Sequence, residues 1–174
     1  MLKKTASILL CAGLASSLYA RDDISKSRTF IGAEIGYVEV QGDTFNELSF
    51  TGDPDIQFGI RIGAEKDEWR TTLIVNYYDS EDNDQNIEQG LIALDYYLLD
   101  NDSAIKPYIG ANIGYANYES TLVEDSGFLY GGQLGVVFNA SDMINLDLSY
   151  RYSLSGTDVF DHSGGVNLAL DYLF

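Results

Sequence analysis

Residues 144–154, INLDLSYRYSL, decide the fold of this chain because their apolar and polar residues alternate without a break. Leucine and tyrosine occupy the even positions from Leu146 to Leu154, and Asn, Asp, Ser and Arg occupy the odd ones. Successive side chains of a β-strand point to opposite faces, so the pattern predicts a strand with one apolar and one polar face. The segment Gly164–Phe174 repeats it.

Six other segments alternate in the same way, which makes eight predicted strands of about 10–12 residues each. A strand of this length crosses a bilayer when it is tilted by about 45°. Short and long connections follow one another, as is typical of an up-and-down barrel with turns at one end and loops at the other. The six segments are Thr29–Val40, Asp55–Glu65, Trp69–Tyr78, Glu88–Leu98, Lys106–Tyr118 and Phe128–Asn139.

Alternation alone fits either a membrane barrel with its apolar face outside or a soluble lipid-binding barrel with that face inside. The apolar face is built of large residues, whereas the opposite face is rich in Gly, Ala, Ser and Asn. The interior of an eight-stranded barrel is only just wide enough for side chains, so the small polar residues fit there. We therefore predict an all-β fold, an eight-stranded antiparallel up-and-down transmembrane β-barrel.

The predicted inner face carries charges of both signs, which a closed lumen requires to pair with one another. We expect them to form a network that stabilises the barrel: Glu34, Arg61, Glu65, Arg70, Asp95, Lys106, Asp147, Arg151 and Asp171. The predicted outer face carries aromatic residues near both strand ends, as in the belts at bilayer interfaces. Trp69, Tyr96 and Tyr172 lie near the short turns, and Tyr37, Tyr77, Tyr115, Tyr130 and Tyr152 near the long loops.

The first twenty residues predict export. Lys3 and Lys4 precede an apolar run that ends before Ala20, in the pattern of a secretory signal peptide cleaved after Ala20. The predicted organisation is a signal peptide at residues 1–20, a short periplasmic segment at 21–28 and the barrel at 29–174. An uncleaved membrane anchor is the alternative for the first segment.

Composition excludes several function classes. The 174 residues include 27 Asp and Glu against 10 Lys and Arg, a formal net charge of −17, which is unsuited to binding nucleic acid. One Cys and one His are too few for a zinc site, and we expect no cofactor.

The four predicted long loops carry acidic residues and neither Lys nor Arg. Such a surface attracts basic partners, and it repels anionic lipopolysaccharide unless divalent cations bridge the two. Asp79, Glu81, Asp82 and Asp84 are the candidates for calcium, although their spacing lacks the Gly and closing Glu of an EF-hand loop, so we favour a solvated acidic loop and predict no metal site. The thirteen loop carboxylates are Asp43, Glu47, Asp53, Asp55, Asp79, Glu81, Asp82, Asp84, Glu119, Glu124, Asp125, Asp158 and Asp161.

Three motifs resemble those of a known family. The end of the chain, Leu168-x-Leu170-x-Tyr172-x-Phe174, resembles the assembly signal of bacterial outer-membrane barrels, which implies that role for Leu170, Tyr172 and Phe174. KPYIGANIGY at 106–115 and LDLSYRY at 146–152 resemble strands of the small barrels that include the membrane domain of OmpA and OmpX. The resemblance implies the outer membrane of a Gram-negative bacterium, insertion by the barrel assembly machinery, and contact with lipid and lipopolysaccharide.

Some barrels of this size are enzymes acting on lipid A, and one type resembles a His-x-Ser pair followed by a Glu. His162 is directly followed by Ser163, and no Glu comes after it, so we expect no catalytic residues. We predict a non-enzymatic structural or surface-interaction role, in adhesion or membrane integrity, through the acidic loops and with cationic or host-surface ligands. The alternatives are a narrow channel or carrier for small solutes, and a lipid A-modifying enzyme.

Overall fold

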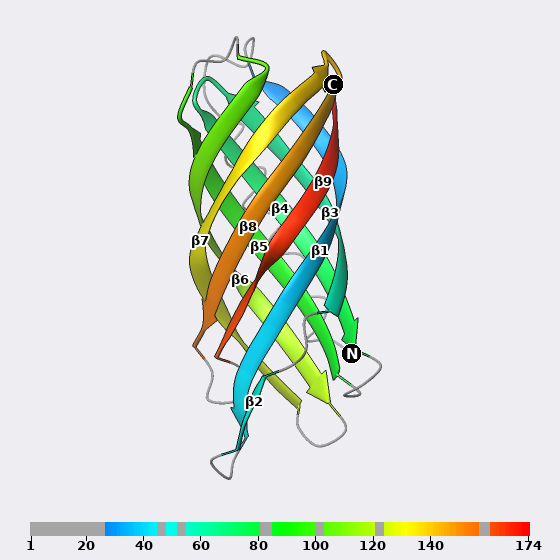
Figure 1. The fold of residues 1–174 in the computed structure, drawn as a ribbon, viewed down its shortest axis with the longest axis vertical. Helices are drawn as coiled ribbons and strands as arrows, with labels where there is room; N and C mark the ends of the chain where they lie inside the picture. Colours follow the sequence, from blue (N-terminus) through cyan, green and yellow to red (C-terminus); the bar gives the residue numbers. More distant parts are fainter. Residues whose placement is uncertain are drawn as a thin grey trace, which may run out of the picture.

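The computed structural model describes residues 27–44, 48–51, 55–80, 85–99, 103–120, 124–156 and 161–174. They form a closed, all-antiparallel β-barrel of eight long strands, to which one short strand is added (Figure 1). No helix among the described residues is long and apolar enough to cross a membrane. The strands are β1 (Arg28–Thr44), β2 (Leu48–Thr51), β3 (Asp55–Lys66), β4 (Trp69–Ser80), β5 (Gln85–Tyr97), β6 (Ile105–Ser120), β7 (Glu124–Ser141), β8 (Ile144–Ser155) and β9 (His162–Leu173).

The barrel closes where its first and last long strands meet. β1 pairs with β3 along one edge and with β9 along the other, from Phe30↔Leu173 to Gln41↔His162. Every other long strand pairs with its neighbours in the sequence, so the topology is up-and-down (Figure 1). The predicted fold class is confirmed.

One end of the barrel has tight turns, and we call it the short-turn end. Lys66 pairs with Trp69, so only Asp67 and Glu68 connect β3 to β4. Asp67 has a φ of 52°, in the left-handed region that aspartate tolerates better than most residues. The opposite end, which we call the loop end, carries β2 and the longer connections (Figure 1).

Several strands are longer than the sequence predicted, always at the loop end. β6 and β7 pair as far as Glu119↔Glu124, and β1 continues to Thr44, where it pairs with β2 inside the predicted first long loop. Apolar alternation ends where only one face of the sheet no longer needs to be apolar, but backbone hydrogen bonding continues. The alternation therefore marked the apolar band rather than the full strands.

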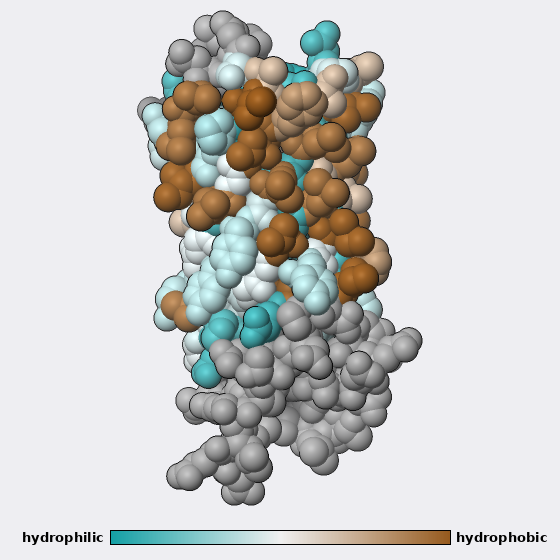
Figure 2. All heavy atoms as spheres, viewed as in Figure 1, coloured by the Kyte–Doolittle hydropathy of each residue, from teal (hydrophilic) through white to brown (hydrophobic). Residues whose placement is uncertain are grey.

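The predicted orientation of the two faces is confirmed. Large apolar side chains cover the outside, with Ile60 68% exposed and Leu134 59% exposed, whereas Asp147 on the polar face is 0% exposed. On the side shown in Figure 2, brown apolar residues form a broad band, and paler residues border it toward the loop end. The predicted aromatic residues of both belts are exposed, and Trp69 packs edge-to-face on Tyr96 with ring centroids 5.0 Å apart.

Small residues on the inner face are required by the narrow lumen. A Cβ added to Gly110 would collide with Asp95 Oδ1, and one added to Gly59 would collide with Asn76 Oδ1. These glycines leave the space that the larger inward side chains occupy.

Candidate functional site

The centre of the lumen is an ion-pair layer organised around Asp147 on β8. Arg61 Nη2 donates to Asp147 Oδ2 at 2.9 Å, and Arg70 Nη1 donates to the same oxygen at 2.8 Å. The other carboxylate oxygen accepts the Tyr108 hydroxyl at 2.9 Å. Asp147 is 0% exposed and both arginines are 3% exposed or less, so this layer is shielded from water. Buried charges of this kind are tolerated only when paired and hydrogen-bonded.

The layer extends to both sides through shared partners. Arg70 donates from Nε to Asp95 at 2.9 Å, and Gln133 donates to the other Asp95 oxygen at 2.7 Å. The oxygen of Gln133 accepts from Arg151 Nε at 2.9 Å, and Arg151 Nη1 donates to Glu34 at 2.9 Å. The chain of contacts therefore links strands β1, β4, β5, β7 and β8 across the lumen.

The three remaining charges predicted for the lumen lie nearer the short-turn end. Asp171 Oδ1 is 3.0 Å from Arg61 Nε, and Glu65 accepts the Tyr97 hydroxyl at 2.9 Å while lying 3.7 Å from Arg28. Lys106 has its ammonium 5.1 Å from the centre of the Tyr97 ring. Among the described residues no carboxylate lies within ion-pair distance of Lys106. All nine predicted lumen charges are buried, and eight of them form ion pairs.

Inward aromatic residues, which the sequence analysis did not predict, close the short-turn end. The guanidinium of Arg70 lies 4.4 Å from the Tyr108 ring centre and 5.7 Å from that of Tyr97, and Arg61 lies 5.6 Å from that of Phe30. Such contacts stabilise desolvated cations. Strand parity was the available signal, because Tyr108 lies two residues after inward-facing Lys106.

The lumen at the loop end is more apolar than we predicted. The expectation of small polar residues throughout the interior is wrong here, because no charge remains to be solvated above the ion-pair layer and large side chains fill the space. The buried apolar cluster consists of Val38, Ile74, Tyr78, Ile87, Leu91, Ala93, Ala116 and Leu129.

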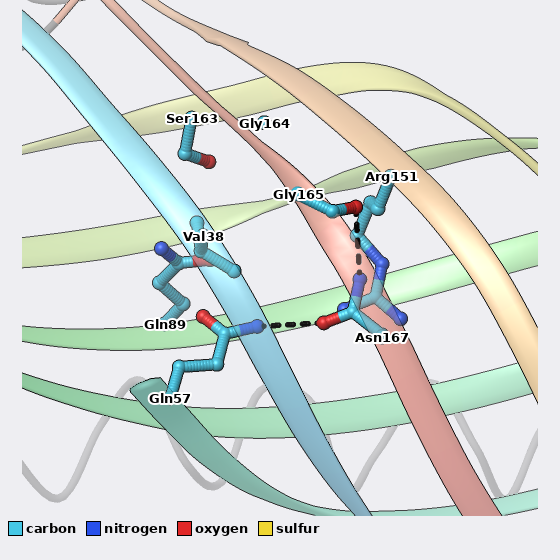
Figure 3. A pocket seen from close by; sticks show the side chains of 8 residues that line it. All are labelled: Val38, Gln57, Gln89, Arg151, Ser163, Gly164, Gly165 and Asn167. Atoms are coloured by element: carbon cyan, nitrogen blue, oxygen red, sulfur yellow. Dashed lines mark hydrogen bonds between the residues drawn. The ribbon is translucent and has the colours of Figure 1, made fainter. Parts of the chain in front are cut away.

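A small polar cavity lies beside this cluster, between β1, β3, β8 and β9 (Figure 3). Gln57 donates to Asn167 at 3.1 Å, and Asn167 donates to the carbonyl of Gly165 at 3.4 Å. The cavity volume is about 10 Å³, which is room for about one water molecule. Arg151, paired with Glu34, also lines the cavity, so the space ends at the ion-pair layer.

The candidate catalytic pair is split between the two faces of the barrel. His162 packs against the outward ring of Tyr152, with ring centroids 5.2 Å apart. Ser163 is buried in the lumen at 7% exposure. The strand geometry therefore keeps this hydroxyl away from the imidazole, and adjacent residues do not form a catalytic pair.

Most of the acidic loop residues cannot be placed. Asp79 belongs to β4, whereas Glu81, Asp82 and Asp84 lie outside the described residues. Within the described part of the chain, no group of three or more His, Cys, Asp or Glu residues is placed to hold a metal ion. The one carboxylate of the last predicted loop that is described, Asp161, is exposed.

The residues of the predicted assembly signal lie on the outside of the last strand. Leu170 and Tyr172 are about half exposed, and Phe174 is 70% exposed. The backbone of Phe174 is held at the closing seam, where its N–H donates to the Thr29 carbonyl at 2.9 Å.

The comparisons with known proteins agree with this architecture. Among solved structures, the chain is similar to Neisserial surface protein A, with 19% identity, coverage of 84% of this chain and 97% of that one, and a TM-score of 0.66. It is similar to outer membrane protein H of P. aeruginosa (19% identity, coverage of 84% and 99%, TM-score 0.59). It is also similar to the outer membrane enzyme PagL (14% identity, coverage of 82% and 98%, TM-score 0.53).

At these identities the structural similarities show the fold alone. No curated protein matches the sequence significantly. A family model described as "Outer membrane protein beta-barrel domain" matches residues 7–174. The chain therefore belongs to the family of outer membrane β-barrel proteins that this model describes.

Proposed function

We propose that this outer-membrane barrel is a non-enzymatic structural or surface-interaction protein that contacts basic partners through its acidic loops. The distribution of charge carries the proposal. After Arg70 the sequence has only two basic residues, Lys106 and Arg151, and both are buried in the lumen. The four loops contribute thirteen carboxylates and no basic residue.

A surface of one sign attracts partners of the other sign, and salt weakens this attraction because exposed charges are screened. Suitable ligands are cationic peptides or basic patches on host-surface proteins, as in adhesion. Contact with anionic lipopolysaccharide requires divalent cations between the two sets of negative groups, and such bridges would contribute to membrane integrity.

Binding to poly-lysine beads tests this function. Barrel in phosphatidylcholine nanodiscs should be retained at low salt and released at about 0.5 M salt, where screening is nearly complete. A variant with Asp79→Asn, Glu81→Gln, Asp82→Asn and Asp84→Asn should be retained less. Glu68→Gln, at the short-turn end, is the control with one neutralised carboxylate. Equal retention of the loop variant and the wild type would contradict the role of this loop.

The channel alternative is disfavoured by the ion-pair layer and by the aromatic residues that close the short-turn end. Planar-bilayer recordings should show no steady conductance from the folded barrel. A reproducible unitary conductance would favour a narrow channel or carrier instead.

The lipid A-modifying alternative is disfavoured by the separation of His162 from Ser163. The fold similarity to PagL does not bear on it, because the identity is 14%. Mass spectra of lipid A from cells with and without the gene should be identical. A mass difference of one acyl chain would establish the enzyme.

Two further proposals concern the path of the chain to the membrane. We propose that residues 1–20 are removed on export, leaving residues 21–28 in the periplasm, and that Leu170, Tyr172 and Phe174 guide insertion. N-terminal sequencing of the membrane-bound protein should begin at Arg21. Phe174→Ala should lower the amount of assembled barrel in cells without altering the folded protein's stability by more than about 1 kcal/mol, since this side chain is exposed.

A further inference from the structure

Two outward-facing glutamates interrupt the outer surface of the barrel at the level of the loop-end tyrosine belt. Glu88 on β5 and Glu39 on β1 are both exposed, and they lie on opposite sides of the strand order. Each is adjacent to an outward-facing glycine and to two tyrosines of the belt. We call these groups the Glu88 niche (Glu88, Gly90, Tyr77, Tyr115) and the Glu39 niche (Glu39, Gly164, Tyr37, Tyr152).

In the Glu88 niche the pairing register fixes the neighbours. Glu88 lies directly opposite Tyr77 of β4, and Gly90, two residues further on the same face, lies directly opposite Tyr115 of β6. Directly opposed residues have Cβ atoms roughly 4.5–5.5 Å apart. A Cβ built on Gly90 meets no atom within 4 Å, so the surface beside the carboxylate is open between the two rings. Tyr77 and Tyr115 are 46% and 49% exposed.

The Glu39 niche has the same four residue types in a different order. Gly164 of β9 lies between Glu39 of β1 and Tyr152 of β8 in one cross-strand row. The ring of Tyr152 leans over the glycine, with its Cδ2 3.0 Å from the position a Cβ would occupy. Tyr37, two residues before Glu39 on the same face, supplies the second exposed ring. One carboxylate and two rings therefore surround a position without a side chain in both niches.

This combination suits a cationic amine. Ammonium groups are attracted to the faces of aromatic rings within about 6 Å, and a carboxylate adds an ion pair. A phosphate group finds no basic partner here, because the two basic residues that follow Arg70 lie in the lumen. The tyrosine belt sits at the level of lipid headgroups.

We propose that the Glu88 and Glu39 niches bind the ammonium groups of amine-bearing lipid headgroups. The lipid phosphate stays on the solvent side of each niche, and the amine enters between the tyrosine rings toward the glycine. The barrel would thereby select its neighbours in the bilayer by headgroup. This inference is independent of the loops and their partners.

Native mass spectrometry of the barrel in maltoside micelles tests the proposal. The micelles contain equimolar phosphatidylethanolamine and phosphatidylglycerol with identical acyl chains, together with EDTA. We expect up to two tightly retained lipids per barrel, with ethanolamine lipid favoured about fivefold, since each contact is of modest strength.

Glu88→Gln and Glu39→Gln should each remove one retained ethanolamine lipid, and the double variant should remove the preference. Gly90→Val fills the open space beside Glu88 and should act like Glu88→Gln, although it retains the charge. Glu68→Gln, an exposed glutamate in the turn at the other end, is the matched control and should behave as wild type. Each variant is first shown to be folded by its resistance to SDS before boiling.

Three results would overturn the proposal. The first is equal retention of the two lipids by the wild type. The second is an unchanged preference in the double variant. The third is a preference that exists only without EDTA, which would assign the niches to divalent cations that bridge carboxylate and phosphate.

Discussion

Replacing Asp147 by asparagine removes one negative charge from the ion-pair layer without changing the shape of the side chain. The carboxylate accepts from Arg61, Arg70 and Tyr108 at 2.8–2.9 Å. An asparagine can keep all three contacts, because its oxygen can face the guanidiniums and its NH₂ can donate to the Tyr108 oxygen. The variant therefore measures the charge rather than the number of hydrogen bonds.

The expected loss follows from what each arginine retains. Removing one partner of a buried ion pair costs about 3–5 kcal/mol. Arg61 keeps Asp171 at 3.0 Å and Arg70 keeps Asp95 at 2.9 Å, so neither guanidinium is left without a carboxylate. We therefore expect Asp147→Asn to lower the free energy of unfolding by about 3 kcal/mol, the lower end of that range.

Urea unfolding in lipid vesicles measures this loss. Trp69 is the only tryptophan and is half exposed on the outer surface, so its fluorescence reports transfer from lipid to water. Asp67→Asn is the matched control, because Asp67 lies exposed in a turn and asparagine tolerates its positive φ. The control should remain within about 0.5 kcal/mol of the wild type.

A loss below about 1 kcal/mol for Asp147→Asn would refute the reasoning, since the charge would then contribute little. A second variant checks the mechanism. In the Asp147→Asn background, Arg70→Met removes a guanidinium that has lost part of its compensation, so the two changes should be less than additive. Strict additivity would show that the two groups do not interact.

Three other predictions concern the lumen and use the same unfolding assay or the shift in gel mobility between boiled and unboiled samples. Gly110→Ala should prevent formation of the SDS-resistant barrel, because its Cβ collides with Asp95, whereas Gly90→Ala should form it normally; equal behaviour would contradict the assigned faces. Tyr108→Phe should cost about 1–2 kcal/mol, since a charge-assisted hydrogen bond to Asp147 is lost; no change in the urea midpoint would contradict this. Lys106→Met should change stability by less than about 1 kcal/mol, because no ion pair is broken among the described residues; a loss above about 3 kcal/mol would reveal a carboxylate partner.

The strands were predictable because the barrel imposes a period of two on every residue between its two surfaces. Ile144–Leu154 was predicted and Ile144–Ser155 is observed. The strand β2 was not predicted, because Leu48–Thr51 lies beyond the apolar band and pairs through its backbone rather than through a patterned face.

The set of inward charges was predictable, but their partners were not. Arg61 on β3 lies near Asp147 of β8 and Asp171 of β9, which are 86 and 110 positions away in the sequence. These contacts depend on the stagger between strands and on which side chains reach across the lumen. Neither property is encoded in the alternation of a single segment.

The seam between β1 and β9 makes insertion an all-or-none event. Its partners, such as Phe30 and Leu173, come from the two ends of the barrel sequence, so this pairing carries the largest loop-closure cost and completes last. Until then two strands expose a row of unpaired amides and carbonyls, which hydrocarbon cannot solvate. A half-closed barrel is therefore never a resting state in the bilayer. The rate at which this protein appears in the membrane is set by how long both edges are protected, not by how fast any single hairpin forms.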